Sequence, residues 1–269
     1  MRNGAAYRRR FLTAHPICCF CGGDAPATTI DHIPSRATFN DRQWPVGYDF
    51  PACLSCNSTS AHHEQLISVL SRMGSINPTA EEAAEYEFLL EGLRNNHPNV
   101  VNEMRASANQ VRAFLRTRGQ SLGNGLTSRD VPILSVRGQL VKAAVAEFAR
   151  KLFLSLHYKH TGNIVSPSGG IAMKWITNSS EENPEFVDSI NQLRNGLPHN
   201  PEMKRSSARL ENQFSYKYFT NDEGTFSAYF VVFRESFAMI GNVRSDSQDF
   251  PPIMLDNAIL KPYRNKAIA

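Results

Sequence analysis

All five cysteines of this 269-residue chain lie within one short stretch, from Cys18 to Cys56. Four of them form two Cys-x2-Cys pairs, Cys18/Cys21 and Cys53/Cys56, which are separated by 31 residues. A secreted disulfide scaffold spreads its cysteines over the parts that need cross-links, whereas two such pairs supply four thiolates from two tight turns. The spacing therefore predicts a structural Zn²⁺ site, with four reduced, buried cysteines as the alternative. Cys19 stands outside this pairing, and we expect it to be a buried thiol.

The composition is that of an ordinary globular protein. Hydrophobic residues make up 41% and charged residues 20% of the chain, which argues against disorder. No apolar run approaches the roughly 20 residues of a membrane helix, and the first ten residues contain no apolar signal-peptide core. We therefore expect a soluble, cytoplasmic protein without a membrane partner.

The basic residues favour a phosphate-bearing partner. The formal net charge is +4, and every basic residue before Lys142 is an arginine. A planar guanidinium can donate hydrogen bonds to two phosphate oxygens at once, which suits binding to the backbone of a nucleic acid. The alternative is a compositional bias of a GC-rich genome, which favours arginine without any ligand.

Hydrophobic periodicity divides the chain into three units and predicts an α+β fold. Residues 1–75 contain the cysteine pairs, and residues 76–125 read as a helical connector that ends in a glycine-rich linker. This connector should contain one helix that starts after a capping box at Thr79 and Glu82, and a second helix over 99–118. Over residues 126–269 the sequence predicts an α+β domain of unknown role. Its expected elements are a broad apolar helix around 141–156, a strand over 171–177, a short helix from 184 and an antiparallel meander over 214–219, 226–233 and 237–243.

Three polar residues stand beside the cysteine pairs. Asp31 and His32 lie between the pairs, and Asn57 follows the second pair directly. A carboxylate and an amide oxygen suit Mg²⁺, and a neutral imidazole nearby can take a proton from water. On a strand, Asp31 and His32 point to opposite faces, so that one can bind the metal while the other faces a scissile phosphate. The alternatives are a structural His32 bonded to backbone and an Asn57 that only caps a helix.

This order of residues resembles a known family. Cys18-x2-Cys21, then Asp31-His32-Ile33-Pro34, then Cys53-x2-Cys56-Asn57 is similar to the zinc-ribbon type of HNH endonuclease, with its ββα-metal fold. The resemblance covers about residues 18–60 and implies two strands near 28–32 and 48–51, followed by a helix starting near Asn57. It also implies that Asp31 and Asn57 bind a catalytic Mg²⁺ or Mn²⁺, that His32 is the general base, and that the four cysteines hold Zn²⁺.

The chain departs from that family at two places. Tyr48 stands where the family has its middle asparagine, and either Tyr48 or Asp49 could replace the hydrogen bonds of that residue. The lysine often found after the last asparagine is missing, and His62 and His63 stand there instead. These two histidines and Arg36 are candidate phosphate contacts, with ordinary solvated surface residues as the alternative.

The resemblance implies a metal-dependent endonuclease that hydrolyses phosphodiester bonds in DNA and leaves 5′-phosphate and 3′-hydroxyl ends. Cutting both strands would need a homodimer or two successive nicks. Small HNH proteins with extra domains resemble components of phage-defence or restriction systems. Two alternatives are a non-catalytic zinc ribbon that binds nucleic acid, and an interaction subunit whose C-terminal meander docks a protein partner.

Overall fold

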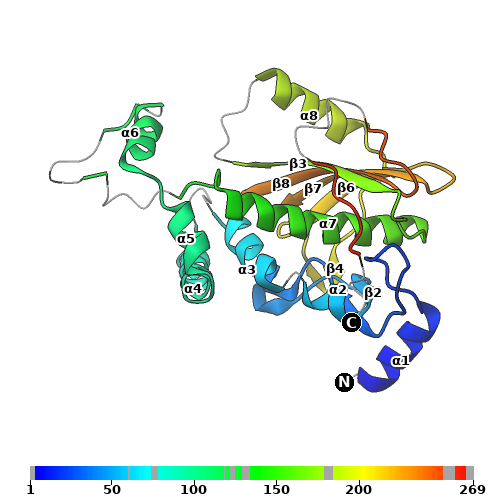
Figure 1. The fold of residues 1–269 in the computed structure, drawn as a ribbon. Helices are drawn as coiled ribbons and strands as arrows, with labels where there is room; N and C mark the ends of the chain where they lie inside the picture. The colour runs from blue at the N-terminus through cyan, green and yellow to red at the C-terminus, as the bar shows by residue number, and fades with distance from the viewer. Residues whose placement is uncertain are drawn as a thin grey trace.

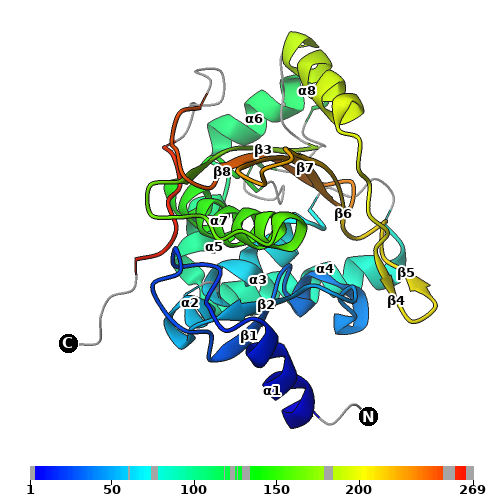
Figure 2. The same cartoon turned by 90° about the vertical axis from the view of Figure 1, so that its right-hand side faces the viewer.

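The chain folds as a mixed α+β protein in which one long helix lies between a sheet and the cysteine-rich N-terminal part. The computed structural model describes residues 4–59, 61–73, 78–117, 119–121, 125, 127–128, 134–178, 184–250 and 258–264, with the backbone alone at 61, 62, 184 and 186. Helix α7 (Gln139–Thr161) runs between a four-stranded antiparallel sheet and the N-terminal part of the chain (Figures 1 and 2). Among the described residues, every helix is too short or too polar to cross a bilayer.

The N-terminal part is built around a two-stranded hairpin. Helix α1 (Gly4–Ala14) precedes strand β1 (Thr29–His32), which pairs antiparallel with β2 (Asp49–Ala52). The short 3₁₀ helices η1 (Arg36–Thr38) and η2 (Asn40–Arg42) lie in the connection, and α2 (Leu54–Ser58) and α3 (Ala61–Leu70) follow β2. Both strands lie within about one residue of their predicted positions. The helix predicted to start near Asn57 begins earlier, at Leu54, because Cys53 acts as its N-cap and accepts a hydrogen bond from the Cys56 backbone N–H.

The described residues of the connector contain three helices instead of the two expected. Helix α4 (Ala80–Asn96) starts at the predicted capping box, in which Thr79 and Glu82 exchange hydrogen bonds. The helix predicted over 99–118 is divided into α5 (Pro98–Met104) and α6 (Ala108–Thr117). The division falls at Arg105, whose backbone is extended and forms a bridge with Leu134. A contact with a segment almost 30 residues away thus interrupts a helix that local sequence alone favours.

The C-terminal part contains the sheet in the order β3-β8-β7-β6. The three strands of the predicted meander are β6 (Ser215–Thr220), β7 (Phe226–Phe233) and β8 (Phe237–Arg244), and β3 (Gly170–Thr177) pairs with β8. Helix α8 (Pro184–Gly196) covers the sheet face opposite α7 (Figure 1), and a small hairpin of β4 (Lys204–Arg205) and β5 (Ala208–Arg209) precedes β6. At Gly241 on β8, a Cβ atom would lie 2.4 Å from the Phe153 ring, so a glycine lets α7 approach the sheet closely.

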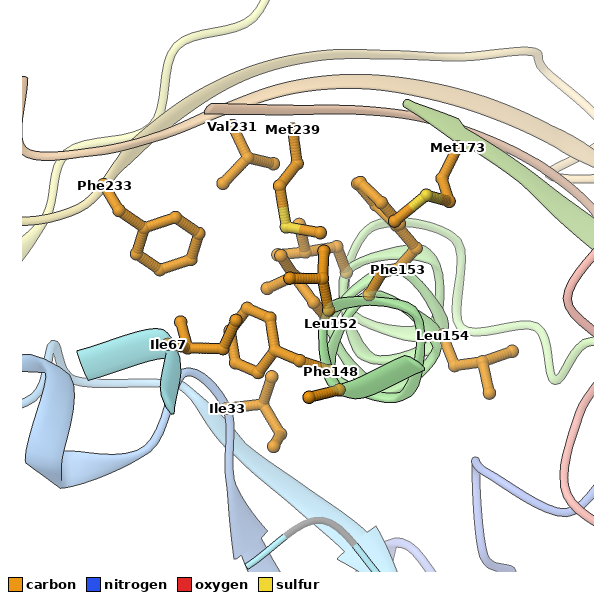
Figure 3. Packing of buried hydrophobic residues seen from close by; sticks show 14 of the residues in the cluster. Ile33, Ile67, Phe148, Leu152, Phe153, Leu154, Met173, Val231, Phe233 and Met239 are labelled. Carbon is orange, nitrogen blue, oxygen red and sulfur yellow. The ribbon is translucent and has the colours of Figure 1, made fainter. Parts of the chain in front are cut away.

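One buried cluster connects all three predicted units through α7. In Figure 3, Phe148 lies toward Ile33 and Ile67 of the N-terminal part, while Phe153 lies toward Met173 of the sheet. These side chains belong to a continuous hydrophobic core that runs from Cys18 to Val243. The predicted units 1–75, 76–125 and 126–269 therefore share one core. Their description as separate domains stays a prediction.

Candidate active site

The four paired cysteines form a compact, buried sulfur cluster. The Sγ atoms of Cys18, Cys21, Cys53 and Cys56 all lie within 4.8 Å of one another. A tetrahedral Zn²⁺ with Zn–S bonds of about 2.3 Å places its sulfurs about 3.8 Å apart, so this cluster fits the predicted structural zinc site. Hydrogen bonds from the Cys18 and Cys56 thiols lower the pKa of Cys21 to about 4, which favours a thiolate in the cluster.

Local structure explains how the two cysteine turns meet. The first turn closes through a hydrogen bond from the Cys18 N–H to the Ala25 carbonyl at 3.0 Å, and Gly22 and Gly23 take up the positive φ angles it needs. The adjacent Cys19 N–H donates to the Pro51 carbonyl on β2, which ties this turn to the hairpin. Cys19 itself is a buried thiol outside the sulfur cluster, as predicted, and burial raises its pKa.

His32 forms a hydrogen-bonded pair with Asp49. The two residues stand opposite each other in the register of β1 and β2, and the His32 Nδ1 lies 2.6 Å from the Asp49 Oδ1. The second Asp49 oxygen accepts a hydrogen bond from the Tyr7 hydroxyl. Burial by itself would raise the pKa of Asp49, but the hydrogen bonds from His32 and Tyr7 more than offset it, so the pKa is lowered. The ionised carboxylate thus favours the His32 tautomer with the proton on Nδ1 and leaves Nε2 free to accept.

Tyr48 and Asp49, the two residues predicted to replace a middle asparagine, have different partners in the structure. Asp49 contacts His32, whereas Tyr48 points into the core and donates to the Tyr216 hydroxyl at 2.9 Å. Tyr48 is 2% exposed. Tyr48 directly precedes β2, and Asp49 is its first residue. Consecutive residues of an extended strand face opposite sides, so the two side chains point in opposite directions.

Arg36 and Trp44 contact His32, and Arg205 contacts Trp44. The Arg36 Nη2 donates to the His32 Nε2 at 2.5 Å, and the Arg36 guanidinium lies 3.9 Å from the centre of the Trp44 ring. The Arg205 guanidinium, from β4, lies 3.8 Å from the same ring and donates through Nε to the Trp44 carbonyl. The His32 side chain is 25% exposed and Asp49 15% exposed, so this group lies at the protein surface. We refer to His32, Asp49, Arg36, Trp44 and Arg205 as the His32 cluster.

Asp31 lies on the opposite face of β1, away from the His32 cluster. Its carboxylate is 2.7 Å from the Nζ of Lys151 on α7, and its other oxygen accepts from the His32 backbone N–H at 2.9 Å. Asp31 is 6% exposed, and Lys151 is fully buried. The Lys151 Nζ also donates to the backbone carbonyl of Asn57 at 3.2 Å, while the Asn57 side chain donates to the Thr29 hydroxyl at 3.0 Å.

This arrangement does not fit the predicted Mg²⁺ or Mn²⁺ site. Asp31 and Asn57 lie close together, but both Asp31 oxygens accept hydrogen bonds and a buried ammonium already balances the carboxylate charge. A divalent cation at Asp31 would lie next to that ammonium and would lack the open set of oxygen ligands that Mg²⁺ requires. The geometry brings His32 together with Asp49 and Arg36, and it brings Asp31 and Asn57 together with Lys151.

The remaining predicted phosphate contacts have different outcomes. Arg36 lies in the His32 cluster, in a position where its guanidinium can reach an anion bound there. The His62 side chain lies outside the described residues, and His63 is half-buried on α3, where its contact with phosphate stays a prediction. Sequence reasoning missed Trp44, Lys151 and Arg205. The last two come from the C-terminal half of the chain and give no local signal.

No protein family, no curated protein and no solved structure matches this chain. The resemblance to HNH endonucleases therefore rests on the sequence pattern between Cys18 and Asn57.

Proposed function

We propose that this chain is an endonuclease that hydrolyses phosphodiester bonds in DNA, with His32 as the general base. The observation that carries the proposal is the 2.6 Å contact between the His32 Nδ1 and the Asp49 carboxylate on the hairpin that the sulfur cluster flanks. A base held by a carboxylate, at the surface and next to the Arg36 guanidinium, is the arrangement expected for attack of water on a phosphate.

The chemistry follows from the His32 cluster. The His32 Nε2 takes a proton from a water molecule, and the resulting hydroxide attacks phosphorus as the P–O3′ bond breaks. Asp49 stabilises the imidazolium formed in this step, and Arg36 and Arg205 stabilise the negative charge on the phosphate. The leaving 3′ oxygen takes a proton from solvent, which gives the 5′-phosphate and 3′-hydroxyl ends.

Arg36 has a second role in this scheme. Without substrate, its guanidinium donates to the His32 Nε2, the same atom that must accept a proton from water. A phosphate oxygen is the stronger acceptor for a guanidinium, so bound DNA should draw Arg36 away and expose the base.

The test is nicking of a supercoiled plasmid by the zinc-loaded full chain, with Mg²⁺, Mn²⁺ or EDTA present. The wild type should nick, and His32→Ala should lose about 10²-fold or more of the rate, the usual contribution of a general base. His199→Ala is the matched control, because His199 is an exposed histidine in the C-terminal part. Equal rates for the wild type and His32→Ala, with equal melting temperatures, would remove the proposal.

A non-catalytic nucleic-acid-binding protein is the second candidate. The pairing of Asp31 with Lys151 favours it, because the resemblance implies that Asp31 binds a catalytic cation. This candidate predicts DNA binding that weakens steeply with added salt, and no cleavage with any divalent ion. The predicted homodimer and the protein partner of the C-terminal part stay predictions under both candidates.

A further inference from the structure

The Lys151 ammonium lies in a pocket made by the cysteine-rich part of the chain. Its Nζ is 2.7 Å from the Asp31 carboxylate, 3.2 Å from the Asn57 carbonyl and 5.5 Å from the centre of the Phe20 ring. Phe20 is fully buried and stands between Cys18 and Cys21 in the sequence. We propose that the chain's own groups form a binding site for the Lys151 ammonium here. In this site, Lys151 of α7 takes the place of the divalent cation that the HNH resemblance implies at Asp31.

The chemistry of the pocket suits an ammonium and not Mg²⁺ or Mn²⁺. An ammonium has three N–H donors and one positive charge, and the pocket offers one carboxylate, one carbonyl oxygen and one aromatic face. A divalent cation seeks about six oxygen ligands, and the face of Phe20 supplies none. The carboxylate of Asp31 balances the single charge of Lys151 and leaves no net negative charge for a second cation.

The packing of α7 holds Lys151 in this pocket. The next residues along the helix, Leu152, Phe153 and Leu154, are all buried in the core that joins the sheet to the N-terminal part. The Lys151 side chain is itself fully buried, so displacement by a cation would leave its charge without a partner in the interior. Such an unpaired buried charge is strongly unfavourable, so Lys151 requires Asp31 whether or not a divalent ion is present.

The inference is independent of the proposed nuclease activity, and its test uses binding and stability. Mn²⁺ binding to the zinc-loaded full chain is measured by the loss of the free Mn²⁺ signal in electron paramagnetic resonance. The wild type is compared with the double variant Asp31→Asn/Lys151→Met, which keeps the shape of the pair and removes both charges. We expect the same Mn²⁺ binding in both proteins. A Mn²⁺ site that is present in the wild type and absent from the double variant would overturn the inference.

The charge pair is tested by melting temperature. Lys151→Met should lower it by several degrees or more, because Asp31 is then left buried and charged, and adding Asp31→Asn should restore part of the loss. Lys159→Met is the matched control on the same helix, since Lys159 is half-buried and donates to the Gly47 carbonyl. A Lys151→Met protein no less stable than the control would contradict the inference.

A measurement on the wild type alone decides the case if Lys151→Met does not fold. Reductive methylation followed by mass spectrometry should modify the exposed Lys204 and leave Lys151 unmodified at every Mn²⁺ concentration. Methylation of Lys151 that increases with Mn²⁺ would show that the ion displaces the ammonium, and the inference would then be wrong.

Discussion

Asp31 and His32 are neighbours in the sequence, but their side chains lie in opposite environments. Alternation along β1 directs His32 to the surface, where Asp49 and Arg36 bond its two ring nitrogens. The same alternation directs Asp31 into the interior, where Lys151 neutralises it. At the scale of the residue, the candidate base and the predicted metal ligand are therefore separate sites, and the partner that matters for His32 is Asp49.

Replacement of Asp49 tests that partnership. Asp49→Asn removes the charge that stabilises the imidazolium and the preference for the proton on Nδ1. We expect the plasmid-nicking rate to fall by about 10²-fold, with little change in the DNA concentration that gives half-maximal rate. The exposed Asp24→Asn is the control and should nick like the wild type. A full rate for Asp49→Asn would show that His32 does not depend on this carboxylate.

At the scale of the element, the sulfur cluster and the hairpin β1–β2 depend on each other. Cys53 and Cys56 follow β2 and begin α2, while the turn of Cys18 and Cys21 is bonded to β2 through the Cys19 N–H. A hairpin of two four-residue strands is marginal by itself. A metal bound at the four sulfurs would fix both turns and hold His32 opposite Asp49.

Loss of one sulfur should therefore disorganise the whole hairpin. Zinc bound to four thiolates contributes on the order of 10 kcal/mol to folding, so Cys56→Ala should lose the bound zinc and lower the melting temperature by more than about 10 °C. Cys19→Ala is the matched control, since Cys19 is equally buried but outside the cluster. Zinc analysis and thermal unfolding followed by circular dichroism provide the measurement. Equal zinc content in the two variants would contradict the assignment of the site.

At the scale of the whole molecule, α7 carries a second set of buried polar groups toward the sheet. His157 Nδ1 lies 2.8 Å from the Ser227 hydroxyl on β7, and His160 Nε2 lies 2.7 Å from the Tyr216 hydroxyl on β6. Burial lowers the pKa of His157 to about 4, and burial together with the nearby Lys159 charge lowers that of His160 to about 3. Both imidazoles are therefore neutral in the folded protein at neutral pH.

These pKa values predict acid sensitivity of the fold. Between pH 6.5, the ordinary histidine pKa, and about 4, the unfolded chain binds protons at both positions while the folded chain does not. The free energy of unfolding should then decrease as the pH falls, by up to about 1.4 kcal/mol per pH unit for each histidine. Urea unfolding at pH 7.5, 6 and 5 measures this slope. His160→Gln should reduce the slope, and the exposed His199→Gln should not; a fold that gains stability over this range would contradict the prediction.

Short-range patterns in the sequence were sufficient for several parts of this protein. The two Cys-x2-Cys pairs predicted the sulfur cluster, the capping box predicted the start of α4, and strand-like runs separated by turn residues predicted the meander. The two cysteine pairs lie 31 residues apart, but each pair is a local turn. The two turns, the capping box and the strand-like runs all depend on residues a few positions apart, so they follow from local backbone preferences. The break between α5 and α6 does not, because Arg105 forms its bridge with Leu134.

Local patterns were therefore enough to predict the sulfur ligands, the hairpin and most elements, together with the candidate base. Which charges meet depended on tertiary packing. Lys151 stands 120 residues from Asp31, inside a helix whose apolar pattern gives no sign of a buried cation, and Arg205 stands 161 residues from Trp44. Pairing of charges over such distances depends on how α7 and the sheet pack against the hairpin, and that packing brought an ammonium to the carboxylate where a divalent cation was expected.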